Sequence, residues 1–397
     1  MSKHVVVAGV GMIPFKKPGQ SDSYAVMGAT AARLALEDAG LPYDQIQQAY
    51  VGYVYGDSTC GQAALYKIGV TGIPVVNVNN NCSTGSSALF LARQAVESGA
   101  VECALALGFE FMQPGALGSK WTDREGALDQ FTSIANPMVS DAVEAGVPRA
   151  LTLFGGAGRE HMQKYGTKLE TFAKIRAKAS RHAANNPLAV FRDVVTPDDV
   201  MNEKVMWPGV MTRSMACPPT CGAAAAVVCT EAFAKKHNLR VDVRILAQSM
   251  TTDVPESFDP PSMIRLVGFH MAEKGARAVY EQAGVSPSDI QVCELHDCFA
   301  HNELLTYESL GFARVGEAEK MVEDGDNTYG GKVVINPSGG LLSKGHPLGA
   351  TGLAQCYELT HQLRGTAEKR QVEGVQLALQ HNLGLGGACV VTLYGRG

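Results

Sequence analysis

Apolar and polar positions alternate along the chain in two kinds of segment. Short runs rich in Val, Ala and Leu predict buried strands, and longer stretches with an apolar residue every three or four positions predict helices. Strands that alternate with helices are typical of an α/β fold. Strands are predicted at residues 5–9, 48–53, 75–78, 103–107, 223–230, 243–248, 291–295, 375–380 and 388–393. Helices are predicted at residues 24–39, 83–98, 275–283, 303–310 and 349–363.

An internal repeat predicts that the chain consists of two similar halves. Residues 39–47 are similar to residues 283–291, and each segment follows a predicted helix and precedes a predicted strand. Cys82 and His346 stand at a second pair of matching helix starts, in the same order along the chain. A helix, a glycine and a strand follow one another in many α/β proteins, but two ordered matches favour duplication.

The halves are placed at residues 1–268 and 269–397. The stretch from about residue 115 to 221 departs from the repeat, because it carries both tryptophans, several prolines and a cluster of cations at 176–182. We predict that it is a loop domain inserted into the first half and lying over the sheet. Long insertions in compact folds are usually functional.

Composition agrees with a large buried core. Of the 397 residues, 46% are hydrophobic and 18% are charged, which excludes an intrinsically disordered chain. The formal net charge is −5, so nucleic-acid binding is not expected. Apolar runs stay below the ~18 residues of a membrane span, so none is expected.

The chain ends and the cysteines bear on the compartment. The apolar run near the N-terminus is too short for a signal peptide, and Gly395-Arg396-Gly397 is not a peroxisomal signal. We expect a cytoplasmic protein, or a peroxisomal one if the source is eukaryotic. The 10 cysteines show neither a disulfide framework nor the paired spacing of a zinc site. We therefore expect reduced thiols and no bound metal.

Two predicted helix starts carry groups suited to nucleophilic catalysis. Cys82 stands where unpaired N–H groups and the helix dipole favour a thiolate, although a buried structural cysteine is the alternative. His346 lies in a Gly-rich loop at the equivalent place of the other half. It could face Cys82 across a pseudo-twofold axis and act as its base, with a structural histidine as the alternative.

Two further segments offer supporting groups. His296-Asp297-Cys298 places acid–base side chains at the carboxyl end of a strand, where α/β sites gather, or else forms a capped helix start. Gly386 and Gly387 lie in a turn where backbone N–H groups can converge on an oxyanion. As a phosphate loop this turn fails, because no Lys-Ser/Thr pair and no helix follow it.

Together and in this order, the motifs resemble the thiolase superfamily and, within it, thiolases of the sterol-carrier-protein-2 type. The resemblance covers essentially the whole chain, including residues 51–61 and 325–332. Ordinary thiolases carry Asn-Glu-Ala-Phe where this chain has residues 296–299, and a second cysteine where it has Asn382. The loss of that cysteine and the gain of Cys298 mark the sterol-carrier-protein-2 type.

The resemblance implies a thiolase fold of two βαβαβαββ halves in five layers (αβαβα), with the loop domain covering coenzyme A. It implies an acyltransferase that cleaves a 3-oxoacyl-CoA with coenzyme A, or runs the reverse Claisen condensation, through an acyl group on Cys82. His346 then takes the proton of Cys82 or holds its thiolate, and helps to bind the thioester or ketone oxygen. Cys298 protonates the acetyl-CoA enolate and later deprotonates coenzyme A, and His296 orients or polarises the other oxygen.

Further contacts follow from the same resemblance. Backbone N–H groups of Cys82, Gly386 and Gly387 are expected to hold the oxyanion. Coenzyme A is a substrate, and no permanently bound cofactor is expected. The insertion is expected to bind its 3′-phospho-ADP part through a set of cations whose alternative is a solvated helix face: Arg176, Lys178, Arg181 and His182.

Partners and alternative functions stay open at this point. The resemblance implies a homodimer or a dimer of dimers. One alternative is a C-acyltransferase, or a retro-aldolase acting on steroid side-chain CoA esters, that works with a small OB-fold partner subunit. Another is a non-catalytic lipid-binding module. The intact Cys82, Cys298 and His346 argue against the retro-aldolase and against the lipid-binding module.

Overall fold

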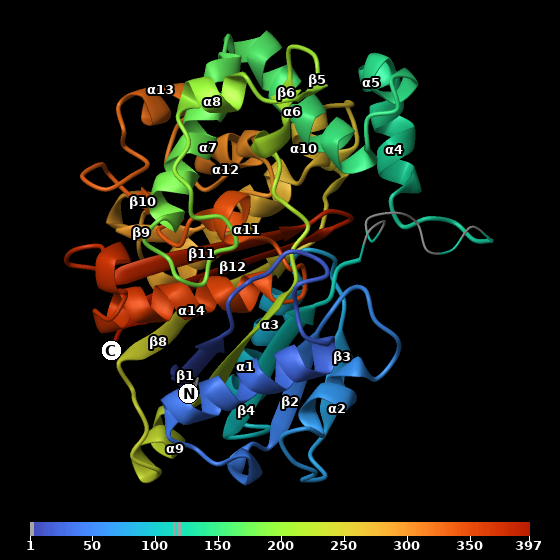
Figure 1. Ribbon diagram of the computed structural model, residues 1–397. Coiled ribbons are helices and arrows are strands. Elements are labelled where there is room, and N and C mark those ends of the chain that lie inside the picture. The colour runs from blue at the N-terminus through green and yellow to red at the C-terminus, as the bar shows by residue number, and fades with distance from the viewer. Residues whose placement is uncertain (1–3, 114–115, 117–120, 122) are drawn as a thin grey trace.

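The computed structural model describes residues 4–113, 116, 121 and 123–397 (Figure 1). Ten strands pair edge to edge in the order β10-β9-β11-β12-β8-β1-β7-β4-β2-β3. Every strand predicted from the sequence is present. The pattern missed β10 (Val334–Ile335), which is too short to show a periodicity, and the hairpin of β5 (Val205–Trp207) and β6 (Met211–Thr212).

The first half of the molecule forms one side of this sheet, with the strand order β3-β2-β4-β7-β1. Its elements follow one another along the chain as β1 (Val5–Met12), α1 (Tyr24–Ala39), β2 (Gln48–Gly52), α2 (Cys60–Leu65), β3 (Val75–Val78), α3 (Thr84–Glu97), β4 (Cys103–Glu110) and β7 (Gly222–Thr230). A short α9 (Glu231–Lys236) then leads out of this half.

The second half repeats this arrangement, with the strand order β10-β9-β11-β12-β8. The predicted boundary at residue 269 is therefore too late, because β8 takes the place that β1 has in the first half. Its elements are β8 (Val243–Thr251), α11 (Phe269–Ala283), β9 (Val292–Glu294), α12 (Ala300–Ser309), β10, α14 (Thr351–Arg364), β11 (Leu377–Gly384) and β12 (Ala388–Arg396). Two short helices, α10 (Met263–Leu266) and α13 (Ala318–Glu323), lie between them.

The two half-sheets are stacked around a central pair of helices. They join where β1 pairs with β8, at Val5–Ile245 and Val6–Arg244. Helices α3 and α14 pack between the half-sheets, α1 covers the outer face of the first and α11 that of the second (Figure 1). Glycine lets the central helices touch, since a Cβ on Gly352 would lie 2.3 Å from the backbone nitrogen of Ser86.

The insertion between β4 and β7 belongs to the first half in sequence but packs on the second. It holds α4 (Asp129–Ala135), α5 (Ser140–Glu144), α6 (Arg149–Tyr165), α7 (Leu169–Ala183) and α8 (Pro197–Met201). Helices α6 and α7 lie against α12 at the top of the molecule (Figure 1). The start predicted near residue 115 lies outside the described residues.

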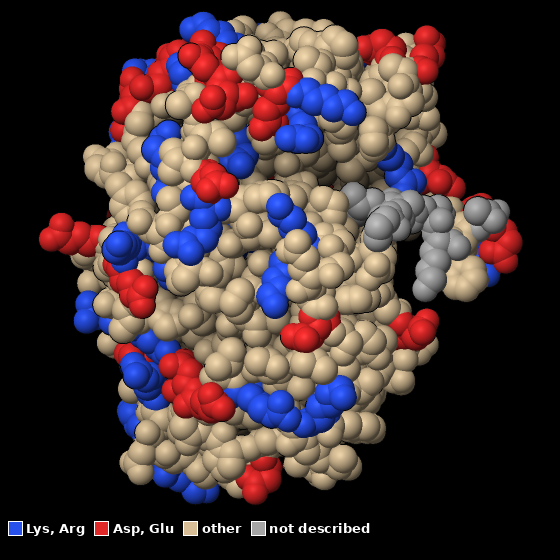
Figure 2. Space-filling model, viewed as in Figure 1, with Lys and Arg blue, Asp and Glu red and all other residues tan. Residues whose placement is uncertain are grey.

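Charged residues on the face shown in Figure 2 are mixed in sign, with Lys and Arg beside Asp and Glu. Among the helices that the structure describes, none has the length and apolar character needed to cross a membrane.

Candidate active site

Cys82 lies on the short loop that connects β3 to α3. Asn81, with φ of 51°, turns the chain, and Thr84 holds the turn by accepting from the Asn80 N–H at 2.8 Å and donating to Asn81 O at 2.6 Å. The loop therefore presents Cys82, which is partly exposed, just before the first turn of α3.

His346 lies on the equivalent loop of the second half, before α14. Its backbone N–H donates to Thr220 Oγ1 at 3.2 Å, and its Nδ1 lies 2.7 Å from Thr351 Oγ1. The Thr351 hydroxyl can donate to Pro347 O, 3.0 Å away, and accept from the ring when the ring proton is on Nδ1. In that tautomer the Nε2 atom of the neutral ring carries a lone pair, the form that a general base needs.

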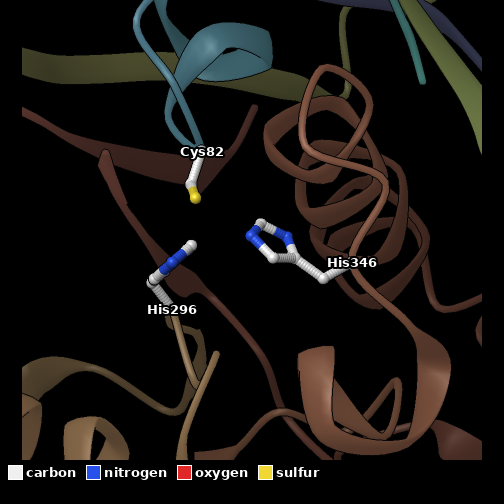
Figure 3. Close-up of side chains that lie close together, drawn as sticks. All are labelled: Cys82, His296 and His346. Atoms are coloured by element: carbon white, nitrogen blue, oxygen red, sulfur yellow. The ribbon is translucent and has the colours of Figure 1, made fainter. Parts of the chain in front are cut away.

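His296 follows β9 and faces the same point from the opposite side. Its ring centroid lies 4.9 Å from that of His346, at an interplanar angle of 80°. One ligand atom from each of Cys82, His296 and His346 lies within 4.8 Å of the others, and Figure 3 shows the three side chains converging. Within the described residues, neither histidine Nε2 has a hydrogen-bond partner. The structure thus brings together three of the predicted catalytic residues.

Burial sets the protonation of this cluster. It raises the pKa of Cys82 to about 12, with a further contribution from the Glu110 carboxylate, while the N–H groups of Cys82 and Leu385 offset part of that rise. Burial and Lys344 lower the pKa of His346 to about 3, and burial lowers the pKa of His296 well below its usual value. Burial therefore opposes the thiolate that the helix start was expected to favour. A thiol in this setting needs a base.

Cys298 lies behind the cluster, on the loop between β9 and α12. It is buried, and burial together with Cys217 and Cys82 raises the pKa of its thiol well above the usual value. The N–H of Cys217 donates to Cys298 O at 2.9 Å. Cys298 is therefore within electrostatic reach of Cys82, and Cys217 is a third thiol at the site.

A cavity of about 550 Å³ opens beside Cys82. The turn between β11 and β12, with Gly386 and Gly387 at φ of 99° and 104°, forms one wall of it. Three residues of the loop before Cys82 also line it, together with two aromatic residues. Two exposed cations complete this part of the lining: Asn79, Asn80 and Asn81 form the loop part, Tyr55 and Trp121 are the aromatic residues, and Arg124 and Arg149 are the cations.

The structure contradicts three of the four predicted coenzyme A contacts. Arg176, Lys178 and His182 are buried and bonded inside the protein. Lys178 pairs with Glu303, Arg176 donates to Ser343 Oγ at 2.8 Å, and His182 Nδ1 lies 3.0 Å from Asn336 O. These three side chains fasten α7 to the second half, so they are not available to a ligand. Arg181 is exposed.

The Cys–His–His cluster also has the residue types of a metal site. Zinc binds cysteine sulphur and one imidazole nitrogen of each histidine. Asn382 Nδ2 lies 3.0 Å from His296 Nδ1, so Nε2 is the ring atom that faces the cluster. The same three groups fit a nucleophile between two imidazoles.

Sequence reasoning missed several residues that hold the site. Glu110 is buried at the end of β4, where burial raises its pKa to about 7, and it accepts N–H groups from Tyr55 at 3.0 Å and Gly349 at 3.0 Å. It thereby ties the first half to the His346 loop. Thr351 lies five positions after His346, a separation that helical spacing does not point to.

Both halves of the chain match models of one family. Residues 5–207 match the thiolase N-terminal domain, and residues 261–394 match the thiolase C-terminal domain-like family. The chain belongs to the thiolase family. Sterol carrier protein 2 of Homo sapiens is 54% identical over 399 residues, which cover 100% of this chain and 72% of that protein. The predicted resemblance to sterol-carrier-protein-2-type thiolases is confirmed.

Further thiolase relatives agree with the predicted enzyme class. Acetyl-CoA acetyltransferase of Methanothermobacter thermautotrophicus is 33% identical and covers 99% of this chain and 100% of that one. The protein is accordingly an acyltransferase of the thiolase family.

Solved structures confirm the predicted fold. The Ltp2-ChsH2(DUF35) aldolase has a TM-score of 0.83 at 22% identity and covers 100% of this chain and 98% of that chain. Human mitochondrial 3-ketoacyl-CoA thiolase has a TM-score of 0.73 at 17% identity and covers 99% of each chain.

Proposed function

We propose that this thiolase is an acyl-CoA:acetyl-CoA C-acyltransferase. It cleaves a 3-oxoacyl-CoA with coenzyme A, or condenses two acyl-CoA molecules, through an acyl thioester on Cys82. The observation that carries the proposal is the neutral Cys82 thiol facing the lone pair on His346 Nε2, within a cluster whose ligand atoms lie within 4.8 Å of one another.

The cleavage begins when His346 Nε2 takes the thiol proton and the sulphur of Cys82 attacks the 3-keto carbon. The bond between C2 and C3 then breaks, which leaves the acyl group on the sulphur and releases the enolate of acetyl-CoA. The Cys298 thiol protonates this enolate and becomes a thiolate. That thiolate takes the proton of an incoming coenzyme A, whose sulphur attacks the thioester. The acyl-CoA leaves, and the expelled Cys82 sulphur takes back the proton held on His346 Nε2.

The oxyanions of these steps need donors. His296 and the backbone N–H groups around Cys82, Gly386 and Gly387 are the candidates on the walls of the site. Removing one such donor costs about 3–4 kcal/mol of transition-state stabilisation in known cases. The cavity of about 550 Å³ supports the entry of coenzyme A beside Cys82, with Arg124 and Arg149 on its lining for the phosphates.

Mass spectrometry tests the covalent step. After incubation with acetyl-CoA, the intact protein is expected to gain one acetyl group, and peptide mapping is expected to place it on Cys82. The matched variant Cys298→Ser is expected to accept the acetyl group but to release little acetoacetyl-CoA, because no thiol at position 298 then removes the proton of the second acetyl-CoA. Acetylation at another cysteine overturns the assignment.

A homodimer is proposed on a separate ground. Strand β3 ends the ten-stranded sheet and exposes Val76, so its free edge supports pairing with a second copy. Sedimentation measures the oligomeric state.

A second candidate is an acyltransferase or retro-aldolase that needs an OB-fold partner. One structural neighbour, the Ltp2-ChsH2(DUF35) aldolase, is named with a DUF35 partner, and at 22% identity that likeness concerns the fold. Consumption of coenzyme A with formation of acetyl-CoA from a 3-oxoacyl-CoA by this chain alone separates the candidates, because a partner-dependent enzyme would show neither.

A further inference from the structure

Two buried imidazoles face Cys82, and their burial and neutrality do not tell them apart. His346 Nδ1 lies 2.7 Å from Thr351 Oγ1, and with its proton on Nδ1 this ring presents Nε2 as an acceptor. The proton of His296 depends on what its Nδ1 meets, and that atom meets Asn382.

The Asn382 amide can adopt one orientation. Its Nδ2 lies 3.2 Å from Cys82 O, a carbonyl that only accepts, so this atom is the nitrogen. Its Oδ1 accepts from Ser86 Oγ at 2.8 Å. The Nδ2 group therefore also donates to His296 Nδ1 at 3.0 Å.

The hydrogen bonds keep the same donor-to-acceptor direction farther from the site. Ser86 Oγ accepts from Gln380 Nε2 at 2.8 Å, and Gln380 Nε2 also donates to Gly352 O at 2.7 Å, which fixes that amide too. Gln380 Oε1 accepts from the Tyr394 hydroxyl. Tyr394, Gln380, Ser86, Asn382 and His296 are all 0% exposed, so water does not compete for these bonds.

We propose that Asn382 is a positioning residue that holds the ring proton of His296 on Nε2, at the end of a one-way hydrogen-bond chain from Tyr394. His296 then donates to the oxyanion while His346 accepts the thiol proton. The division of roles rests on the proposed function, but the location of the proton does not.

A carboxylate at position 382 reverses the last link. In Asn382→Asp the side chain only accepts, so His296 is expected to place its proton on Nδ1 and to turn a lone pair toward Cys82. Nitrogen NMR of protein labelled with 15N-histidine reports the tautomer, and the His296→Asn variant identifies the signal. The unchanged protein is expected to show Nε2–H, and Asn382→Asp is expected to show Nδ1–H.

Asn302→Asp is the matched control. Asn302 Nδ2 donates to the backbone carbonyl of His296 at 2.6 Å, whereas the hydrogen bond to the ring comes from Asn382, so this variant is expected to keep Nε2–H. Nδ1–H in the unchanged protein overturns the proposal without any variant. The proposal also fails if Asn382→Asp and Asn302→Asp both switch the tautomer, or if neither does.

Kinetics add a readout that loss of packing alone would not give. Asn382→Asp is expected to lower kcat by about 10²–10³, as the loss of an oxyanion donor does, with KM for acetoacetyl-CoA unchanged. A switched tautomer with unchanged kcat would overturn the donor role of His296. If the unchanged protein turns over no acyl-CoA, the proposed function fails while the tautomer result still stands.

Discussion

Two loops occupy the same place in the two halves of the molecule, and they prepare a sulphur and a nitrogen by different means. The Cys82 loop spans residues 79–83 and leads from β3 directly into α3. The His346 loop spans residues 336–350 and is buried through most of its length. Duplication accounts for their facing positions, and divergence accounts for what each presents.

The difference lies in how much of the protein each loop engages. The Cys82 loop is held by Thr84 and by two bonds to the second half, Asn81 Nδ2 to Leu385 O at 3.0 Å and Asn382 Nδ2 to Cys82 O at 3.2 Å, and the residues just before Cys82 line the cavity. The His346 loop is fixed by buried charges, with Lys344 3.1 Å from Glu294 and Asp297 accepting the Leu341 N–H at 2.7 Å. A nucleophile needs access, whereas a base needs a fixed tautomer and a fixed position.

The largest effect is expected from the Cys82 loop. Cys82→Ser replaces the thiol with a poor nucleophile and a poor leaving group, so thiolysis of acetoacetyl-CoA should fall roughly 10⁴-fold or more. Cys60→Ser, at a buried thiol on α2, is the control and should retain turnover. Full activity in Cys82→Ser would remove the distinction between the loops.

The His346 loop should respond next. His346→Ala removes the base, and general-base catalysis is worth about 10²–10⁴-fold in rate. The loss should appear in kcat, measured by coenzyme A-dependent cleavage of acetoacetyl-CoA. An equal loss in kcat and in coenzyme A affinity would point instead to a binding role.

The pH dependence of alkylation tests how Cys82 depends on His346 for its deprotonation. A pKa of about 12 leaves Cys82 mostly protonated at neutral pH, and the thiolate fraction rises with pH up to that value. In His346→Ala no base assists the thiol. The rate of alkylation by iodoacetamide should therefore keep rising with pH beyond about 8.5, the pKa above which the reactivity of a free thiol levels off. A plateau near neutral pH would show a resting thiolate and contradict the structure.

The insertion allows a third comparison, between two roles for Lys178: a buried cation that stabilises the fold, or a contact to coenzyme A. Lys178→Met leaves Glu303 as an unpaired buried charge, which costs about 3–5 kcal/mol of stability in comparable cases. Chemical unfolding should record that loss. A raised KM for coenzyme A with unchanged stability would restore Lys178 as a ligand contact.

The smallest effect is expected at the cavity lining. Arg149→Ala removes an exposed cation there and should raise KM for coenzyme A a few-fold, in line with the ~1 kcal/mol or less of an exposed charge pair. Arg181→Ala, at the exposed member of the four cations predicted from the sequence, is the comparison. A larger rise in Arg181→Ala would place the phosphates on α7.

The sequence predicts the repeated strands and helices well because each half builds its core from strongly patterned segments. Helix α1 begins and ends where predicted, and β3 does so too. Strand β10 and the helices of the insertion were not predicted, because their apolar patterns are short or interrupted by charged residues. The boundary at residue 269 failed because β8 is recognised as a first strand only by its partners.

At the site, the loop positions of Cys82, His346 and His296 followed from motif and topology. The positions of the ring protons on His346 and His296 could not be predicted. They depend on how the side chains of Thr351, Asn382 and Ser86 are oriented in hydrogen bonds, which the spacing of residues along the chain does not show. The cations at 176–182 misled for a related reason. A helical pattern shows that they share an element, but their buried partners Glu303, Ser343 and Asn336 lie far along the chain.

These partners have a consequence for synthesis of the chain. Lys178 and Glu303 are 125 residues apart. At roughly 5–20 residues per second, the carboxylate is made about 6–25 s after the cation it neutralises. Helix α7 therefore cannot settle while only the first half exists. We expect a ribosome-bound chain that stops before α12 to leave the insertion open to protease after the rest of the first half has gained protection.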